Sequence, residues 1–446
     1  MTARDNTQAD DLSVQTASLP GRNRILLAMM AQVFMVSLGI GLVGPIMPLY
    51  AQSFGVGAAM VGGLVTAFGI ARIIVNVPVG RLVEKIGRKP LLVGGPLLTS
   101  TAALLMGLST QFEHLIFWRF LQGLGSAAQM TAAMVCLADI TTSENRGRIM
   151  SRYQGSMLVG ASFGPTLGGL VGEHFGFRAP FFVYSALTFS AVIWALLVVP
   201  ETRRYTQLKV QTGRNEAGTS RKDQSGQAPD RPFTAMSLFR DPNFWLVSLV
   251  SLTIFFTRTG SRNTVLPLYG NSVLGLSAGQ VGFTFTLTAI FNLLTVNLSG
   301  SLCDRYGRKA VIAPACVLSG LSLICFSLSP NYTYFLLSAG LLGIGTGLAG
   351  PAPAAYVTDL AGPGNYGLAM GIFRTFSDVG ISIGPLFLGA LSDQFGYMMA
   401  LRVNAIMFAG AGLAFGLLAK ETLVRDRGAQ PARAQPGGIA GGSRVS

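Results

Sequence analysis

Long apolar segments constrain this chain more than any other feature. A helix needs about 20 mostly apolar residues to cross a bilayer, because its backbone polar groups must be hydrogen-bonded inside the hydrocarbon. Only 12% of the residues are charged, about half the share typical of soluble domains. The sequence predicts an all-α membrane protein with twelve transmembrane helices, at 25–50, 58–80, 91–109, 113–139, 149–172, 180–199, 243–270, 279–302, 310–329, 332–358, 366–391 and 399–419.

The predicted spans fall into two groups of six. Residues 201–241 form a polar stretch with almost no apolar content, which predicts a disordered cytoplasmic linker. The same composition predicts disordered cytoplasmic tails at 1–24 and 421–446, and no cleaved signal peptide is expected. The chain is therefore divided into an N-terminal half at 25–200 and a C-terminal half at 242–420.

The distribution of lysine and arginine predicts the orientation. With the N-terminus inside, 26 of the 33 basic residues lie in cytoplasmic segments, as the positive-inside rule requires. We therefore expect a multi-pass protein of the cell (inner) membrane with both termini cytoplasmic. Topology accounts for most of the net charge of +14, so no nucleic-acid partner is predicted.

The sequence offers little for covalent or metal chemistry. The four cysteines lack metal-ligand spacing, and the two histidines, His114 and His174, are isolated. No GxxxxGK followed by Ser or Thr is present, so ATP is excluded as the energy source. We expect no metal, no cofactor and no enzymatic activity.

An internal repeat of 220 residues relates the two halves. GRLVEKIGRKP at 80–90 recurs as GSLCDRYGRKA at 300–310. The same offset maps further pairs: Asp139 onto Asp359, Gly164-Pro165 onto Gly384-Pro385, and Phe175-Gly176 onto Phe395-Gly396. A duplicated six-helix unit predicts two pseudo-symmetric parallel halves that rock about a site at the midplane.

These features resemble the major facilitator superfamily, and within it most closely the drug:proton antiporters. The resemblance is carried by the six-plus-six arrangement and by two copies of the loop Gly-x-x-x-(Asp/Glu)-x-x-Gly-Arg-Lys, and it covers about 25–420. It implies the major facilitator fold and secondary active transport by alternating access. The resemblance also implies that the proton gradient is the energy source and that no cofactor is used.

The repeated loop implies, by the same resemblance, a charge relay that locks the outward-facing state. In the first copy Glu84 stands where the family has an aspartate. The alternative is that the basic loops serve only topology and solubility. The predicted conformational latch consists of Glu84, Arg88 and Asp139 with their counterparts Asp304, Arg308 and Asp359.

Two further motifs resemble those of the antiporters. LIFWRFLQGLGSA at 115–127 implies that Arg119 participates in proton transfer, and the alternative is a structural arginine bonded to carbonyls. The glycine-proline pattern of the fifth span implies export. The eleventh span repeats much of this pattern, so part of the signal reflects the fold. The predicted close-packing residues of the fifth span are Gly160, Gly164, Pro165, Gly168 and Gly169.

Asp378 is the one acid that falls well inside a predicted span. Counted at 1.5 Å per residue, it lies about 18 Å deep, and Arg72 lies about 15 Å deep in the second span. We expect these two side chains to pair across the two halves and to separate when Asp378 is protonated. Arg374, one turn before Asp378, is the competing partner and would make the pair purely structural.

Arginines also mark the predicted substrate cavity. Arg258 and Arg262 lie in the outer half of the seventh span, and Arg119 lies at a comparable depth. Three arginines near one water-filled cavity would favour an anionic or zwitterionic cargo. The alternative for Arg262 is that its side chain extends to the outer interface.

The sequence thus predicts a secondary active transporter, with proton-coupled efflux of small organic molecules as the leading function. The first alternative is a carrier for an organic anion or metabolite, by import or exchange. A non-transporting membrane sensor is the second. The expected partners are a small-molecule substrate and the lipid bilayer, and the expected functional unit is a monomer.

Overall fold

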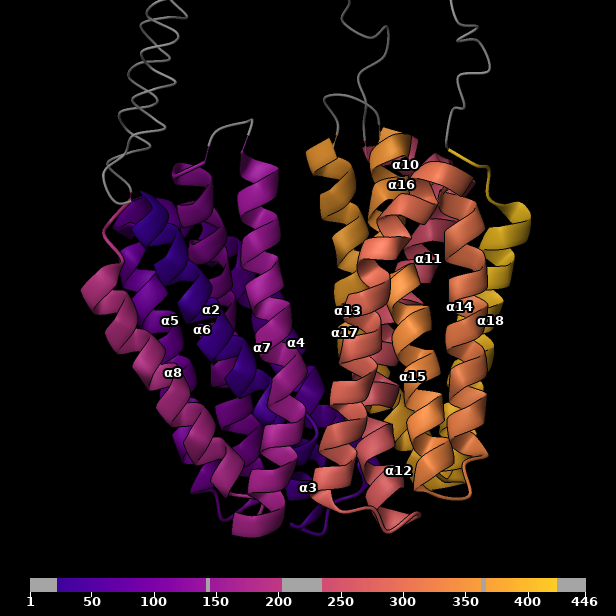
Figure 1. Ribbon diagram of the computed structural model, residues 1–446, viewed down its shortest axis with the longest axis horizontal. Coiled ribbons are helices and arrows are strands. Elements are labelled where there is room, and N and C mark those ends of the chain that lie inside the picture. Colours follow the sequence, from indigo (N-terminus) through magenta and orange to yellow (C-terminus); the bar gives the residue numbers. More distant parts are fainter. Residues whose placement is uncertain (1–21, 142–144, 203–234, 362–365, 423–446) are drawn as a thin grey trace, which may run out of the picture.

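The computed structural model describes residues 22–141, 145–202, 235–361 and 366–422. The N-terminal half consists of α2 (Arg22–Val43), α3 (Ile46–Gln52), α4 (Ala58–Ile86), α5 (Lys89–Gly107), α6 (Phe112–Asp139), α7 (Arg146–Phe175) and α8 (Ala179–Val198). The C-terminal half consists of α10 (Ala235–Arg240), α11 (Pro242–Phe256), the π-helical segment η1 (Thr257–Val265), α12 (Leu266–Ser272), α13 (Ala278–Tyr306), α14 (Arg308–Ser327), α15 (Tyr332–Ala349), α16 (Ala352–Ala361), α17 (Tyr366–Phe395) and α18 (Tyr397–Leu418). The two halves stand side by side as separate helix bundles (Figure 1).

The predicted all-α membrane fold is confirmed. Eleven helices in the described part of the chain are long and apolar enough to cross a membrane. The predicted span at 149–172 is the 30-residue helix α7, which is absent from that group. Its glycines, serines and charged ends lower its hydropathy, and it packs between α2 and α13 rather than facing lipid along its whole length.

The ends of the halves are more ordered than the sequence predicts. α2 begins at Arg22, inside the expected tail, and α10 lies inside the expected linker, where Leu238 is buried. Glu201 and Glu421, placed in the linker and in the C-terminal tail by the sequence, make hydrogen bonds to the folded halves. The rest of the predicted tails and linker, at 1–21, 203–234 and 423–446, lies outside the described residues.

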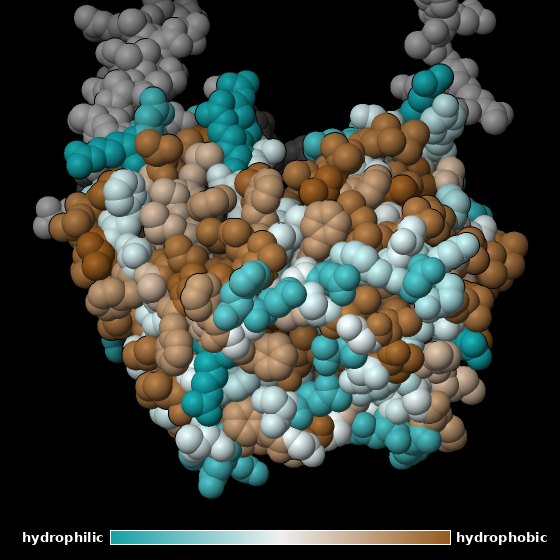
Figure 2. Space-filling view, turned by 60° about the horizontal axis from the view of Figure 1, so that its bottom comes forward, coloured by the Kyte–Doolittle hydropathy of each residue, from teal (hydrophilic) through white to brown (hydrophobic). Residues whose placement is uncertain are grey.

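The outer surface suits a bilayer. Large apolar side chains such as Leu197, Ile406 and Leu417 are exposed on the sides of the bundles. Figure 2 shows brown apolar residues on the flanks, with teal hydrophilic residues gathered over the end that faces the viewer. Burying such flanks in hydrocarbon removes them from water, which is the expected environment of a transmembrane bundle.

Candidate functional site

The charged residues inside the spans gather near the middle of their helices. Arg72 stands at the centre of the 29-residue α4, and Asp378 stands near the centre of the 30-residue α17. Arg258 lies near the middle of the apolar segment Pro242–Ser272, which comprises α11, η1 and α12. α4 belongs to the first half, whereas η1 and α17 belong to the second and pack against it. The two halves therefore face each other across these side chains.

Arg72 contacts side chains of its own half and interacts electrostatically with charged side chains of the other. Its guanidinium donates to the sulfur of Met130 at 3.6 Å, and its Cζ lies 5.8 Å from the centre of the Phe68 ring. It interacts electrostatically with Asp378, Arg374 and Arg258, which are all in the second half. Arg72 thus faces three charged side chains across the space between the halves.

Asp378 forms no direct ion pair in this conformation. No basic nitrogen of the described residues lies within 4.0 Å of its carboxylate, and the carboxylate makes no hydrogen bond to a described residue. Arg72 and the exposed Arg374 act on it only at longer range. The predicted Arg72–Asp378 contact is therefore absent here, although α4 and α17 pack against each other.

The π-helical segment η1 carries the other two arginines. Arg258 is exposed to solvent although it lies in mid-span, and its charge reaches Arg72 in the opposite half. It must therefore face the space between the halves. A π-helix widens each turn and is frequently found at functional sites, so η1 is a signal that the sequence pattern did not reveal.

Polar contacts hold η1 in place. The hydroxyl of Thr257 donates to the Oδ1 atom of Asn404 at 3.2 Å, and the Nδ2 atom of Asn404 donates to Ser261 at 2.6 Å. A Cβ atom at Gly260 would lie 2.7 Å from the carbonyl oxygen of Gly384, so only glycine allows this approach to α17. The unusual turn is therefore fixed from two neighbouring helices.

The alternative for Arg262, in which its side chain extends to the outer interface, differs from what the structure shows. Its guanidinium donates to the backbone oxygen of Phe285 at 3.4 Å, and its Cζ lies 5.4 Å from the centre of that ring. Its Nε atom is buried without a partner. The π-helical turn directs this side chain toward α13 inside the bundle rather than along the helix toward water.

Arg119 is held by side chains rather than by carbonyls. It donates to the side-chain oxygen of Gln122, and its Cζ lies 4.5 Å from the centre of the Phe68 ring. Its Nε atom is buried without a partner, and it interacts electrostatically with Tyr184. Phe68 is therefore shared by Arg119 and Arg72, which places both cations beside one aromatic ring.

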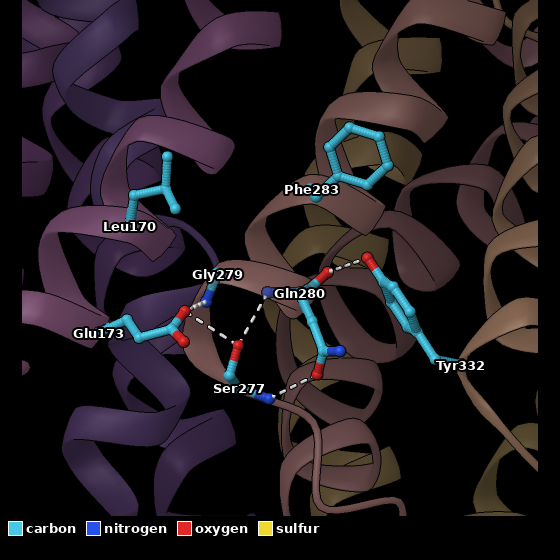
Figure 3. Close-up of a pocket in the computed structure, with 7 residues that line it drawn as sticks. All are labelled: Leu170, Glu173, Ser277, Gly279, Gln280, Phe283 and Tyr332. Carbon is cyan, nitrogen blue, oxygen red and sulfur yellow. Dashed lines mark hydrogen bonds between the residues drawn. The ribbon is translucent and has the colours of Figure 1, made fainter.

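Acids that the sequence reasoning left unassigned hold the two halves together at the ends where α3 and α12 lie, which the predicted orientation places outside and which are called the outer ends below. Glu173, near the end of α7, accepts from the backbone N–H of Gly279 and from the hydroxyl of Ser277, both at 2.9 Å (Figure 3). Asp393, near the end of α17, accepts from Ala58 at 2.7 Å and from Ala59 at 2.8 Å. Each acid thus caps the first turn of a helix in the other half, where the helix dipole favours a negative charge.

Further outer contacts follow the same symmetry. Thr66 donates to the backbone oxygen of Ser382 at 2.6 Å, and Thr286 donates to that of Ser162 at 2.9 Å. Cβ atoms at two glycines would collide with a proline carbonyl of the other half, at 2.1 Å for Gly62 with Pro385 and at 2.3 Å for Gly282 with Pro165. All these pairs are related by the 220-residue offset, which could have revealed them in the sequence.

The opposite ends of the same helices are apart. A Cβ atom at each of four glycines there, on α4, α7, α13 and α17, would find no atom within 4 Å: Gly80, Gly155, Gly300 and Gly371. In the described part of the chain, the hydrogen bonds between the halves run from the end where α3 and α12 lie in Figure 1 to about the middle of α7 and α17, at Ser162 and Ser382. With the predicted orientation, this arrangement is open toward the cytoplasm and closed toward the outside.

The predicted latch residues make contacts within each half. Arg88 and Asp139 form an ion pair at 2.8 Å that is buried on both sides, whereas Glu84 makes no ion pair with Arg88 in the described part of the chain. In the second half Arg308 contacts both Asp304 and Asp359 at 3.1 Å. The second copy is thus a complete triad and the first is a pair, in keeping with the longer acid Glu84 in place of aspartate.

Each latch has a fourth member that the sequence analysis missed. Glu201 accepts from the backbone N–H groups of Arg88 and Lys89, both at 3.0 Å. Glu421 does the same for Arg308 and Lys309, also at 3.0 Å. The two glutamates are again 220 residues apart, but they lie in segments that composition assigned to the linker and the tail.

The predicted glycines of α7 allow close packing on two sides. Cβ atoms at Gly160, Gly164 and Gly168 would lie within 2.6 Å of α2 atoms, the closest being the Leu42 oxygen at 1.9 Å from position 168. At Gly169 the nearest atom is the Ala278 oxygen at 2.5 Å, in the other half. Pro165 supplies the carbonyl beside Gly282. This helix therefore joins its own bundle to the opposite one.

Among the described residues, no group of three or more His, Cys, Asp or Glu side chains is placed to hold a metal ion. The charged side chains that lie in mid-span are instead the arginines Arg72 and Arg258 and one carboxylate, that of Asp378.

Comparison with known proteins gives the chain a family. The sequence profile of the Major Facilitator Superfamily matches residues 29–296 and 263–442. Multidrug resistance protein 2 of Bacillus subtilis is 26% identical over 398 residues, which cover 89% of this chain and 96% of that protein. Quinolone resistance protein NorA of Staphylococcus aureus is 24% identical over 400 residues, covering 90% and 97% of the two chains.

Solved structures show the same fold. The crystal structure of a bacterial homologue of the human lysosomal transporter Spinster, in an inward-facing and unoccupied conformation, superposes with a TM-score of 0.73. The alignment has 15% sequence identity and covers 90% of this chain and 97% of that one. At this identity the match concerns the fold alone.

Proposed function

The chain belongs to the Major Facilitator Superfamily, and from this membership we propose that it is a proton-coupled exporter of small organic molecules. Its two halves alternate between an inward-open and an outward-open state around the midplane residues. The names of the multidrug and quinolone resistance relatives support export of small molecules. We place the protein in the cell (inner) membrane with cytoplasmic termini, on the distribution of basic residues. We further propose that it acts as a monomer and is not an enzyme.

One observation carries the proposal. Asp378 is an acid in mid-span, without a direct partner, and it faces Arg72 of the other half. An ionisable group inside a membrane is costly and is typical of proton and substrate pathways. Protonation of Asp378 would remove its attraction for Arg72 and so change the energy of bringing the halves together at this depth.

The clasped outer end supplies the moving part. In the inward-open state the Glu173 and Asp393 caps hold the outer ends together, and cargo and protons exchange with the cytoplasm. Opening to the outside breaks both caps and closes the cytoplasmic ends. Because the outer contacts are duplicated by the pseudo-symmetry of the halves, both sets can break in one rotation of one half relative to the other.

Purified protein in proteoliposomes tests the proposal. With an imposed pH gradient, fluorescent organic compounds should move against their own gradient, and collapse of the pH gradient should stop the movement. Cargo movement that ignores the pH gradient would contradict the proposal.

A second candidate function is a carrier for an organic anion, by import or exchange. The observation that favours it is the set of arginines inside the spans, Arg72, Arg119, Arg258 and Arg262, of which Arg72 acts electrostatically on the mid-span acid Asp378. An anion and a proton on Asp378 would bind together, because each reduces the charge that opposes the other. Uptake of an organic anion into proteoliposomes, driven by an imposed pH gradient, would identify this function.

A further inference from the structure

We infer that a cavity at the outer ends of the two halves binds a primary ammonium group carried on an apolar chain, and that this ligand holds the outer ends together. The cavity, called the outer site below, has a volume of about 460 Å³. It is lined from both halves, by Leu170 and Glu173 of α7 and by Gln280, Phe283 and Tyr332 of α13 and α15 (Figure 3). The inference goes beyond the proposed function, because it assigns a controlling ligand away from the midplane.

The carboxylate of Glu173 has one oxygen that the cap does not use. Its Oε2 atom accepts both hydrogen bonds of the cap, from the Ser277 hydroxyl and from the Gly279 N–H, each at 2.9 Å. No described residue donates to its Oε1 atom, the residue is exposed, and no basic side chain lines the cavity. The free oxygen therefore offers a charge-assisted hydrogen bond to a cationic N–H donor that enters the cavity.

The equivalent cap of the other half shows that holding the halves does not require a free oxygen. Asp393 uses both of its oxygens, since Oδ1 accepts from Ala58 and Oδ2 accepts from Ala59. The offset of 220 also shows that the polar residues of the outer site have no polar counterparts: Ser277, Gln280 and Tyr332 correspond to Gly57, Met60 and Phe112. The polar cavity is thus an addition to one copy of a cap that works without it.

Apolar side chains extend the outer site toward the middle of the membrane. Leu170 lies one turn before Glu173 on α7, and Phe283 lies one turn after Gly279 on α13, so both are deeper than the carboxylate. Each of these two side chains is 44% exposed. A ligand with its ammonium at the depth of Glu173 can therefore place an apolar chain along Leu170 and Phe283. A multiply charged or wholly polar cation would gain nothing from this part of the site.

Occupancy of the outer site favours the inward-open state. The ligand contacts α7 of the first half together with α13 and α15 of the second, and these walls meet only while the Glu173 cap is closed. A ligand that binds one conformation better than another shifts the equilibrium toward that conformation. An amphiphilic amine on the outside therefore opposes opening toward the outside.

Three seven-carbon probes test the inference on the full-length protein in phosphatidylcholine nanodiscs. Heptylamine is cationic at pH 7 and has N–H donors, heptyltrimethylammonium is cationic without donors, and heptanol is uncharged. Spin-label distances across the outer ends report the ratio of inward-open to outward-open protein. Heptylamine should raise this ratio by about tenfold, the size of one hydrogen bond to a charged group. Heptyltrimethylammonium should act more weakly, and heptanol should leave the ratio unchanged.

Three variants locate the response. Glu173→Gln should abolish the effect of heptylamine, whereas Asp393→Asn, the matched control, removes the equivalent charge from the other cap and should keep that effect. Phe283→Lys keeps Glu173 and brings a tethered ammonium from the second half. It should raise the inward-open fraction without any ligand and should abolish the response to heptylamine.

A lipid headgroup and a soluble amphiphile are two sources of the same ammonium group. Nanodiscs of phosphatidylethanolamine distinguish them. If this lipid raises the inward-open fraction by itself and removes the response to heptylamine, the headgroup occupies the outer site. If heptylamine acts equally in both lipids, the ligand is a soluble amphiphile.

Four results would overturn the inference. The first is an equal response to heptanol, which would show a general effect on the membrane. The second is a response that survives Glu173→Gln and is lost in Asp378→Asn, which would place the amine at the midplane. The third is a full response in Phe283→Lys, and the fourth is no response to heptylamine in phosphatidylcholine. None of these results depends on transport, so proton-coupled export is tested separately.

Discussion

The outer end of the molecule keeps the symmetry of the duplication, whereas the midplane has lost it. Glu173 and Asp393 are related by the 220-residue offset and make equivalent caps. At the midplane the offset pairs Arg72 with Asn292 and Asp378 with Leu158. Arg119 likewise corresponds to Ala339. The π-helical segment η1 corresponds, under the same offset, to the end of the ordinary helix α2 in the first half.

This difference indicates a division of labour. The two outer caps, at Glu173 and at Asp393, must break together when the outer ends separate, so equivalent contacts in both halves serve this motion. Charge recognition needs one site with a defined sign on each wall, which a symmetric pair of halves cannot supply. We therefore assign motion to the symmetric contacts and chemistry to the unsymmetric ones.

The largest expected effect comes from making the midplane symmetric. Arg72→Asn gives α4 the residue that its repeat carries at Asn292, and it removes the cation that faces Asp378. We expect transport in proteoliposomes to fall by roughly 100-fold, which corresponds to about 2.7 kcal/mol. Arg402→Asn is the control, and equal activities of the two variants would contradict the division.

The gate should respond equally in either half. Gly62→Ala places a methyl group against the Pro385 carbonyl, and Gly282→Ala does so against that of Pro165. Such overpacking costs about 1–3 kcal/mol, which should favour the outward-open state by roughly tenfold or more. Spin-label distances across the outer ends measure this shift.

The neighbouring residue Gly63 provides the control for the gate, because its Cβ atom would find open space. Gly63→Ala should leave the distances unchanged. A shift with only one of Gly62→Ala and Gly282→Ala would show that the gate is not symmetric in function.

The latches should differ in strength although they are repeats. Arg88→Gln leaves the buried Asp139 without its ion-pair partner, a change that costs about 3 kcal/mol. Arg308→Gln breaks contacts with the more exposed Asp304 and Asp359, for which about 1 kcal/mol is expected. The melting temperatures of the purified variants should rank in this order, and a larger loss for Arg308→Gln would refute the role of burial.

The smallest effect is expected from single outer caps. Glu173→Gln and Asp393→Asn keep the size of each side chain but remove the charge that complements a helix dipole, worth about 0.3–1 kcal/mol. Each should raise the outward-open fraction by a similar small factor in the spin-label measurement. Glu113→Gln, an exposed acid at the outer end of α6, is the control, and a shift as large as that of the cap variants would disprove their specific role.

The sequence predicted the fold through patterns that can be read along the chain without knowledge of its contacts. Apolar length predicted the spans, and the offset of 220 predicted the two halves, because lipid imposes both patterns locally. It also identified Arg72, Asp378 and Arg258, since charges in a span are conspicuous. Composition misassigned Glu201 and Glu421, because polar residues that cap a folded helix look like any other linker residue.

Other parts of the site required three-dimensional information. No local pattern announces η1, since its turn is held by Asn404 and by α17, far away in the chain. The side chain of Arg262 contacts Phe285 of α13, so the alternative route to the outer interface is not taken. The absence of an Arg72–Asp378 contact depends on how α4 and α17 pack against each other, which no single-residue pattern reveals.

The most direct test compares gradient-driven transport with passive exchange in Asp378→Asn. An amide at this position cannot take up or release a proton, but it leaves the helices free to move. We predict that the variant in proteoliposomes loses pH-driven accumulation of the fluorescent organic compounds and retains their exchange across the membrane at equal pH. Full pH-driven accumulation by Asp378→Asn would contradict the account, because the proton would then bind elsewhere.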